Sequence, residues 1–152
     1  MAGEWVQQVD YPQAPAMTDA ETVALFEQAL FARLGTYNED GTIHIAPMFF
    51  KYDHGQILMA SQGPSRKVRN IQRDKRVSVL VDIPVVPFRG ALVYGTAELD
   101  YEDVVTKRIE IFARTRSREE GEEYARRLSE KWPCVIIRIT PQRIASFDYS
   151  KF

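Results

Sequence analysis

A short basic segment carries the clearest chemical signal in this chain. Gly63 and Pro64 predict a turn, Ser65 follows, and Arg66 and Lys67 open a segment with the pattern of a helix. Backbone N–H groups at a helix start have no partners within the helix, and the helix dipole favours negative charge there. With a hydroxyl, a guanidinium and an ammonium added, this position could bind a phosphate. The alternative, a basic and solvated helix face, is slightly favoured by these residues alone.

The elements around this segment would have to position it. Strand-like runs cover residues 56–61 before the helical segment 64–73 and residues 77–82 after it. Another strand, residues 42–52, contains Pro47, which cannot donate to a ladder and so predicts an edge, a bulge or an opening in the sheet. An opened strand beside a phosphate site would offer free backbone groups to a planar ligand.

The N-terminal part combines an extended arm with a helix and a hairpin. Residues 1–17 contain two prolines, Pro12 and Pro15, and predict the arm, and residues 18–152 predict a single domain. Thr18 and Glu21 have the spacing of a capping box at a helix start. The apolar face expected for this helix consists of Val23, Phe26, Leu30 and Phe31. A strand over 32–37, an Asp-Gly turn over 38–41 and a second turn over 53–55 follow.

The C-terminal part alternates strands with one long helical stretch. We expect strands over 89–99, 134–139 and 143–149, with a turn over 140–142 between the last two. Residues 101–131 predict helix with a break near Arg116 and Ser117. Its charged residues have the spacing of surface ion pairs, and its apolar positions are Val104, Arg108, Ile111, Phe112, Tyr124, Leu128 and Trp132. The order predicts a mainly β fold, an antiparallel barrel with peripheral helices.

Length and composition point to one soluble domain. The 152 residues are 45% hydrophobic and 27% charged, with a formal net charge of −1. The basic segment is therefore local and suits a small anion better than a polymer, so we expect neither nucleic acid nor membrane as a partner. A membrane-length apolar run, a signal peptide and a cysteine framework are not apparent, and Cys134 is the only cysteine. These features favour a cytoplasmic location.

Few side chains suggest acid, base or metal chemistry. His44 lies beside the Pro47 strand, but a partly buried, hydrogen-bonded histidine is the preferred interpretation over a proton donor. His54 falls in a turn, where we expect it to be exposed. Two histidines and one cysteine, far apart in sequence, give no support to a zinc site. Phe49 and Phe50 are adjacent on a strand, so one of them should face the core.

Four segments in order make the chain resemble the pyridoxamine 5′-phosphate oxidase-like flavin-binding split-barrel proteins. They are residues 34–47, 65–71, 76–81 and 95–99, and the resemblance covers about residues 18–149. It implies an antiparallel split β-barrel of the Greek-key type. It also implies a homodimer with two flavins in the grooves between subunits. A partner would also cover aromatic residues that we expect to be exposed, namely Trp5, Tyr11, Phe88, Phe147, Tyr149 and Phe152.

The resemblance also implies a set of cofactor-binding residues. Arg66 and Lys67 match the pair that holds the FMN phosphate, with Ser65 adding a hydroxyl or backbone contact. Asn70 lies about one helical turn further on and could face the same ligand. The strand along the isoalloxazine ring would contain Ala46, Pro47, Met48 and Phe49, and the strand beside the phosphate and ribityl chain would end with Ala60 and Ser61.

Two departures argue against oxidation of vitamin B6. Residues 140–152 do not match the Arg- and Trp-rich end that grips pyridoxal phosphate, and Gly90 stands where the true oxidase offers a glutamine to the flavin. The resemblance then implies an FMN-dependent oxidoreductase that transfers hydride to or from a small substrate, with no catalytic residue assigned. The alternatives are a reductase that uses the deazaflavin F420, and a non-catalytic flavin or haem carrier or sensor.

Overall fold

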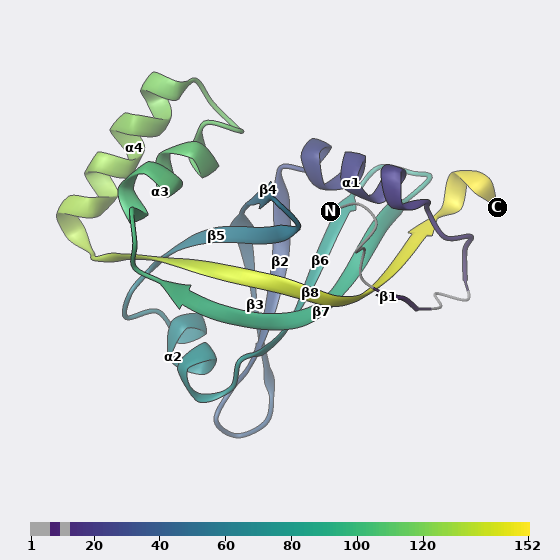
Figure 1. Cartoon of the computed structure of the whole chain (residues 1–152), viewed down its shortest axis with the longest axis horizontal. Helices are drawn as coiled ribbons and strands as arrows, with labels where there is room; N and C mark the ends of the chain where they lie inside the picture. Colours follow the sequence, from purple (N-terminus) through teal and green to yellow (C-terminus); the bar gives the residue numbers. More distant parts are fainter. Residues whose placement is uncertain (1–6, 10–12) are drawn as a thin grey trace.

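One curled antiparallel sheet forms the body of the molecule. The computed structural model describes residues 7–9 and 13–152 (Figure 1). The strand order is β3–β2–β6–β7–β8–β5–β4, and β1 (Gln7–Gln8) pairs with β8 in parallel. The bounds are Phe31–Tyr37 for β2, Ile43–Phe49 for β3, Lys51–Asp53 for β4, Gln56–Gln62 for β5, Arg76–Ile83 for β6, Arg89–Asp100 for β7 and Cys134–Asp148 for β8.

The two ends of the strand order are neighbours in the chain, so the sheet curls back on itself. β3 pairs with β2 and β4 pairs with β5, and only Phe50 separates β3 from β4. Phe50 is fully buried, which confirms that one of the paired phenylalanines is a core residue. Pro47 lies on β3, at the end of the strand order, as expected for a residue without an N–H. The predicted split barrel is confirmed.

The two tight turns are where the glycines predict them. Gly41 ends the β2–β3 turn with a φ of +86°, and Gly55 ends the β4–β5 turn with a φ of +82°. His54 also has a positive φ and is exposed, as expected, with its Nδ1 2.8 Å from Asp53 Oδ1. His44 is half-buried on β3 and pairs with Thr36 of β2.

The C-terminal strand differs from the prediction. The prediction of a turn over residues 140–142 is wrong, because β8 runs unbroken through Pro141 and pairs with β7 on both sides of it. The register shifts where Tyr94 pairs with Arg143 and Gly95 with Pro141, which leaves Gln142 as an extra residue. A Cβ on Gly95 would lie 2.2 Å from the Thr140 carbonyl oxygen, so the bulge requires glycine there.

Helix α1 (Asp19–Gln28) covers one end of the barrel. Its capping box is confirmed: Thr18 Oγ1 accepts from Glu21 N at 3.1 Å, and Thr18 N donates to Glu21 Oε1 at 2.9 Å. The predicted apolar face is only partly correct. The helix ends at Gln28, so Leu30 and Phe31 lie beyond it and are exposed, whereas the buried residues are Thr22, Leu25 and Phe26.

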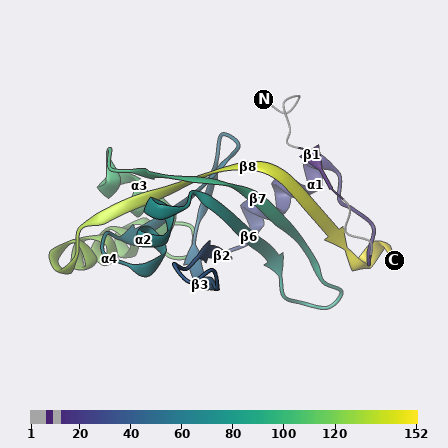
Figure 2. The same cartoon turned by 90° about the horizontal axis from the view of Figure 1, so that it is seen from below.

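Three more helices lie away from α1 (Figures 1 and 2). They are α2 (Arg66–Arg73), α3 (Val104–Phe112) and α4 (Arg118–Lys131). The predicted break is confirmed, with Ser117 as the N-cap of α4. Trp132 follows α4 and is exposed, contrary to expectation, because Gly121 and Ala125 supply the buried face. None of the helices in the described ranges has the length and apolarity to cross a bilayer.

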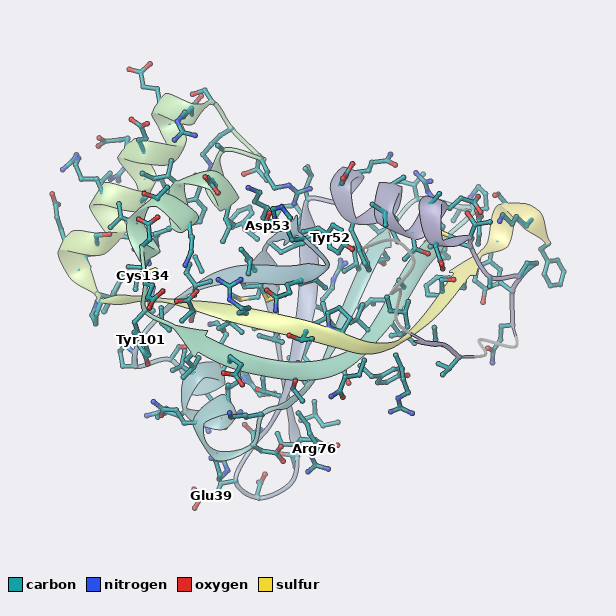
Figure 3. All side chains as sticks on the ribbon, in the orientation of Figure 1. Glu39, Tyr52, Asp53, Arg76, Tyr101 and Cys134 are labelled. Atoms are coloured by element: carbon teal, nitrogen blue, oxygen red, sulfur yellow. The ribbon has the colours of Figure 1, made fainter. Side chains whose placement is uncertain are left out.

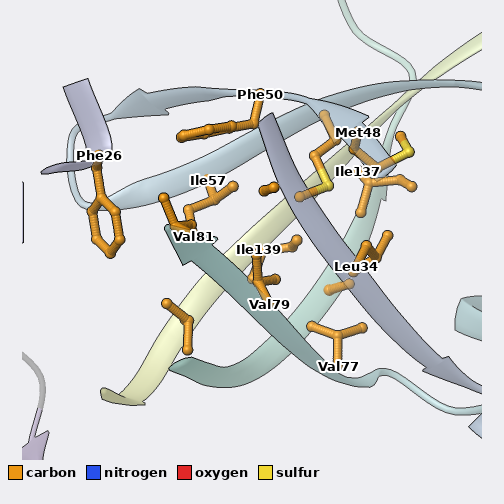
Figure 4. Packing of buried hydrophobic residues seen from close by; sticks show 14 of the residues in the cluster. Phe26, Leu34, Met48, Phe50, Ile57, Val77, Val79, Val81, Ile137 and Ile139 are labelled. Atoms are coloured by element: carbon orange, nitrogen blue, oxygen red, sulfur yellow. The ribbon is translucent and has the colours of Figure 1, made fainter. Parts of the chain in front are cut away.

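Two apolar clusters hold these layers together. The larger fills the curled sheet, where Leu34, Val79 and Ile139 pack with Phe50 (Figure 4). The smaller joins β5 and β8 to the α3–α4 hairpin through Leu58, Ile111, Phe112, Ala125 and Ile136. Neighbouring residues of β5 thus serve different clusters, as the alternation of a strand requires.

The predicted N-terminal arm is part of the packed structure where it is described. Met17 N donates to Ser146 Oγ at 2.9 Å, and Asp148 N donates to Pro15 O at 2.8 Å. β8 is followed by a short 3-10 helix, η2 (Tyr149–Lys151).

The aromatic residues proposed to need a partner's cover have different outcomes. Phe88 and Phe152 are exposed, as expected. The expectation for Phe147 is wrong: it is buried, with its ring over Gly90. Tyr149 is half-buried, and Trp5 and Tyr11 lie outside the described residues.

Candidate functional site

The start of α2 keeps its anion-binding groups free. Ser65 is the N-cap, but its side chain makes no capping bond, and no acidic residue lies in the first turn. Its Oγ lies 3.0 Å from Ser61 Oγ, at the end of β5. This hydroxyl pair joins strand to helix, and the first-turn N–H groups of α2 are left without a side-chain acceptor.

Lys67 and Arg66 add positive charge at this helix start. Lys67 is half-buried, burial lowers the pKa of its ammonium group, and no partner for it exists within the described residues. Arg66 is exposed. The pKa of Asp40, in the β2–β3 turn, is lowered mainly by its hydrogen bonds with Thr42, and Arg66 adds a smaller effect. A half-buried ammonium without an anion is costly, so this geometry suits an anionic ligand.

A pocket of about 190 Å³ opens beside Lys67. β3, β5 and α2 form part of its wall, and the α3–α4 hairpin forms the rest. The lining residues are Pro47, Met48, Phe49, Ala60, Gln62, Lys67, Arg108, Phe112, Tyr124 and Leu128. Five of the ten residues proposed for cofactor binding are therefore brought together here, from three separate elements.

The other proposed residues have different positions. Ser65 and Arg66 form the helix start next to the pocket, Ser61 contacts Ser65 from the end of β5, and Ala46 packs against the main core. Met48 lines the pocket but is itself a core residue, as Figure 4 shows.

Asn70 faces β2. Its Nδ2 donates to Thr36 Oγ1 and to Asn38 Oδ1, both at 3.0 Å, and its Oδ1 accepts from Arg73. Its amide nitrogen thus joins α2 to β2 and to the turn after it, its amide oxygen is bonded within α2, and we do not retain Asn70 in the proposed site. Its spacing from Arg66 along the helix gave no information about this neighbouring strand.

The α3–α4 hairpin supplies pocket residues that the sequence analysis did not assign to the site. Arg108, Phe112, Tyr124 and Leu128 were identified only as buried positions. The available signal was Arg108, an arginine within an otherwise apolar stripe. What the spacing could not show is that this stripe meets β3 and α2 in space.

Arg116 fixes the hairpin against β3. Its guanidinium carbon lies 4.5 Å from the centre of the Tyr124 ring, 5.3 Å from that of Phe49 and 5.4 Å from that of Phe112. Phe49 and Phe112 also meet edge to face at 5.9 Å. Phe49 therefore belongs to the pocket wall.

A second hollow, of about 270 Å³, lies on the strands β2, β6, β7 and β8. Its arginines stack on tyrosines: Arg76 over Tyr37 at 4.9 Å and Arg143 over Tyr94 at 5.2 Å. Arg76 also forms an ion pair with Asp74. The Lys67 pocket is the better candidate because, among the described residues, no ion pair or ring contact engages Lys67. Within the described residues, no group of three or more His, Cys, Asp or Glu side chains could hold a metal.

The fold and this pocket define a split barrel with a candidate anion site at a helix start. A comparison with protein families matches residues 18–148 to pyridoxamine 5′-phosphate oxidase, and the chain belongs to this family of flavin-binding, oxidoreductase-type split barrels. A comparison with curated protein sequences found no match.

Solved structures share the fold. A conserved hypothetical protein, Rv2991, from Mycobacterium tuberculosis is 24% identical with a TM-score of 0.79, covering 94% of this chain and 91% of that one. A protein named F420 reductase is 23% identical with a TM-score of 0.64, covering 80% and 94%. A FAD-binding protein from Mesorhizobium loti is 18% identical with a TM-score of 0.63, covering 88% and 96%.

Proposed function

We propose that this chain is a cytoplasmic, homodimeric oxidoreductase that uses FMN and acts on a small substrate. The observation that carries the proposal is Lys67, a half-buried ammonium without a partner in the described chain, at the free N-terminus of α2 and on the wall of a pocket. A phosphate there would gain charge-assisted hydrogen bonds from Arg66, Lys67 and backbone N–H groups. The residues present therefore fit the phosphate of a flavin.

The protein's part in the reaction is to bind and orient. The flavin, when bound, supplies the redox chemistry. The apolar faces of Phe49 and Phe112 exclude water from the pocket wall, and the hydroxyl pair Ser61–Ser65 keeps the helix start beside the end of β5. The backbone of β3 around Pro47 offers polar groups to a planar ring, because β3 is at the end of the strand order.

A binding experiment tests the anchoring. We expect Arg66→Ala with Lys67→Ala to weaken FMN binding by about 10- to 100-fold, since one hydrogen bond to a charged group contributes roughly 1.5–3 kcal/mol. Riboflavin, which lacks the phosphate, should bind the variant and the unmodified protein equally. Fluorescence titration measures both affinities.

The matched control is Arg69→Ala, on the exposed side of the same helix. It should leave FMN affinity unchanged within twofold. Equal losses in Arg69→Ala and in the double variant would point to general electrostatics and against a phosphate site at the helix start.

F420 is the alternative cofactor, since it also combines a phosphate with a tricyclic ring. Parallel titrations of the unmodified protein with FMN and F420 separate the two, and tight binding of F420 alone would replace FMN in the proposal. Stopped-flow absorption after addition of NADH or NADPH then tests turnover. Reduction of the bound cofactor supports an oxidoreductase. A protein that binds the cofactor, but shows neither reduction by these donors nor reoxidation by acceptors, would instead be a carrier or sensor.

A further inference from the structure

Arg108 is a buried cation whose hydrogen-bonding capacity is largely unused. It lies on α3, is 2% exposed, and lines the same pocket as Lys67. Its Nη1 donates to Ser129 Oγ at 3.1 Å, and its buried Nε has no partner in the part of the chain that is described. A guanidinium has five N–H donors, and burying it without an anion is costly.

The surroundings hold this guanidinium in place but do not neutralise it. Ser129 Oγ donates its own proton to Ala125 O at 2.8 Å, so it can act only as an acceptor toward Arg108. No ion pair joins Arg108 to a carboxylate among the described residues. Its charge acts on Cys134, at the start of β8 (Figure 3), where burial raises the pKa of the thiol and Arg108 offsets part of that rise. A neutral thiol does not compensate a positive charge.

The pocket as a whole is cationic and partly aromatic. Lys67 and Arg108 line it, and no Asp or Glu does so in the described ranges. The aromatic residues Phe112 and Tyr124, from the same hairpin as Arg108, also line it. Such a site suits a planar molecule that carries an acidic group, because a guanidinium can bind a carboxylate or phosphate with two parallel hydrogen bonds.

We infer that Arg108 binds an acidic group, a carboxylate or a phosphate, of a molecule that enters this pocket, in addition to the phosphate held by Arg66 and Lys67. The inference rests on the proposed function for the phosphate at Arg66 and Lys67. The evidence for the acidic group at Arg108 is the buried guanidinium itself, which has no ion pair within the described residues. The acidic group can belong to the substrate or to a cofactor that carries a further acidic group. Arg108 in either case determines which ligands the pocket accepts.

Calorimetric titration of the FMN-loaded protein tests a substrate source. Benzoate is the probe, and benzamide is its neutral counterpart of nearly the same shape. We expect benzoate to bind at least tenfold more tightly than benzamide. Arg108→Met should remove this preference and leave FMN affinity within twofold. The control Arg127→Met, an exposed arginine on α4, should change neither affinity.

Titration with FAD and F420 tests a cofactor source, because both carry acidic groups beyond a single phosphate. If the group belongs to the cofactor, Arg108→Met should weaken one of them at least tenfold and leave FMN unchanged. An Arg108→Met protein with unaltered affinities for benzoate, FAD and F420 contradicts the inference.

Two further measurements separate binding from folding. Because methionine fills a similar volume without a buried charge, ligand-free Arg108→Met should melt at or above the temperature of the unmodified protein. A lower melting temperature would indicate a structural guanidinium and contradict the inference.

If Arg108→Met does not fold, Arg108→Lys carries the test, with a three- to tenfold loss expected for the acidic probe because lysine lacks the planar fork. An unchanged affinity in Arg108→Lys would then contradict it.

Failure of the proposed function is recognised separately. If the unmodified protein binds neither FMN nor F420, the oxidoreductase proposal fails. Benzoate and benzamide titrated into the flavin-free protein still test Arg108 in that case, with the same expected preference and the same control.

Discussion

Lys67 and Asp100 show how differently this fold treats two partly buried charges. Lys67 has no partner in the described chain, and burial lowers its pKa. Asp100, at the end of β7, accepts from Arg138 Nη2 at 2.6 Å and from Lys107 Nζ at 2.9 Å, and these bonds lower its pKa. Asp100 therefore stabilises the junction of β7, β8 and α3. Lys67 makes no such ion pair within the described residues, and we therefore propose that it binds a ligand.

We predict that Asp100→Asn lowers the free energy of unfolding at pH 7 by about 1–3 kcal/mol, because two half-buried cationic donors, Arg138 and Lys107, lose their charged acceptor. The folded pKa lies below the unfolded value, so this stabilisation is present above about pH 4 and is lost as the pH falls through the folded pKa. Urea unfolding at pH 7 and pH 3 measures it. Glu98→Gln, in an exposed pair with Lys75, is the control, and equal effects in both variants would contradict the prediction.

At the scale of elements, β8 and the α3–α4 hairpin shape the pocket. β8 begins directly after α4 and pairs with both β5 and β7, so its position sets where the hairpin rests. The bulge at Gln142 lets this long strand follow the curl of the sheet. Arg116 then fixes the hairpin through three aromatic rings, which brings Arg108 and Lys67 to the wall of one pocket.

We predict that Gly95→Ala destabilises the protein by about 1–3 kcal/mol, because a Cβ 2.2 Å from the Thr140 carbonyl oxygen forces the two strands apart. Chemical denaturation measures the change. Gly63→Ala is the matched control: its Cβ would meet Pro133 at 3.5 Å, an ordinary contact, and its stability should change by less than about 0.5 kcal/mol. A Gly95→Ala protein as stable as Gly63→Ala would show that the bulge tolerates a side chain.

For the whole molecule, an apolar strip on β3 suggests where a second copy binds. Ile43 and Ile45 are 62% and 66% exposed on one face of the strand, and Pro47 and Phe49 continue the same face toward the pocket. An exposed apolar strip on an edge strand is a hazard unless another surface covers it. We propose that the partner subunit covers this strip, which would place it beside the pocket.

We predict a dimer in sedimentation velocity at micromolar concentration. Ile43→Asp with Ile45→Asp should give a monomer, because two charges would be buried in the interface. Val85→Asp with Val86→Asp is the control, since these residues are equally exposed but lie in the loop after β6. A monomeric unmodified protein, or a dimer that survives the β3 substitutions, would argue against this interface.

Local patterns sufficed for several features because the relevant physics acts over a few residues. The capping box at Thr18, the Asp-Gly turn at Gly41 and the free helix start after Ser65 each depend on near neighbours, and the structure contains all three. The split barrel was also predicted, through ordered segments that match a family. Pro141 led to the wrong prediction of a turn in β8. The bulge that accommodates this proline depends on Gly95, which is far away in the sequence.

Only the tertiary structure decided which of these residues meet. Asn70 and Lys67 are both on α2, yet one is bonded to β2 and the other lines the pocket. In the sequence, Arg108 is separated from Lys67 by most of α2 and all of β6 and β7, and it becomes a pocket residue because β8 carries the α3–α4 hairpin back beside β5. Sequence thus determined which groups could bind an anion, whereas long-range strand pairing determined which cations share one pocket.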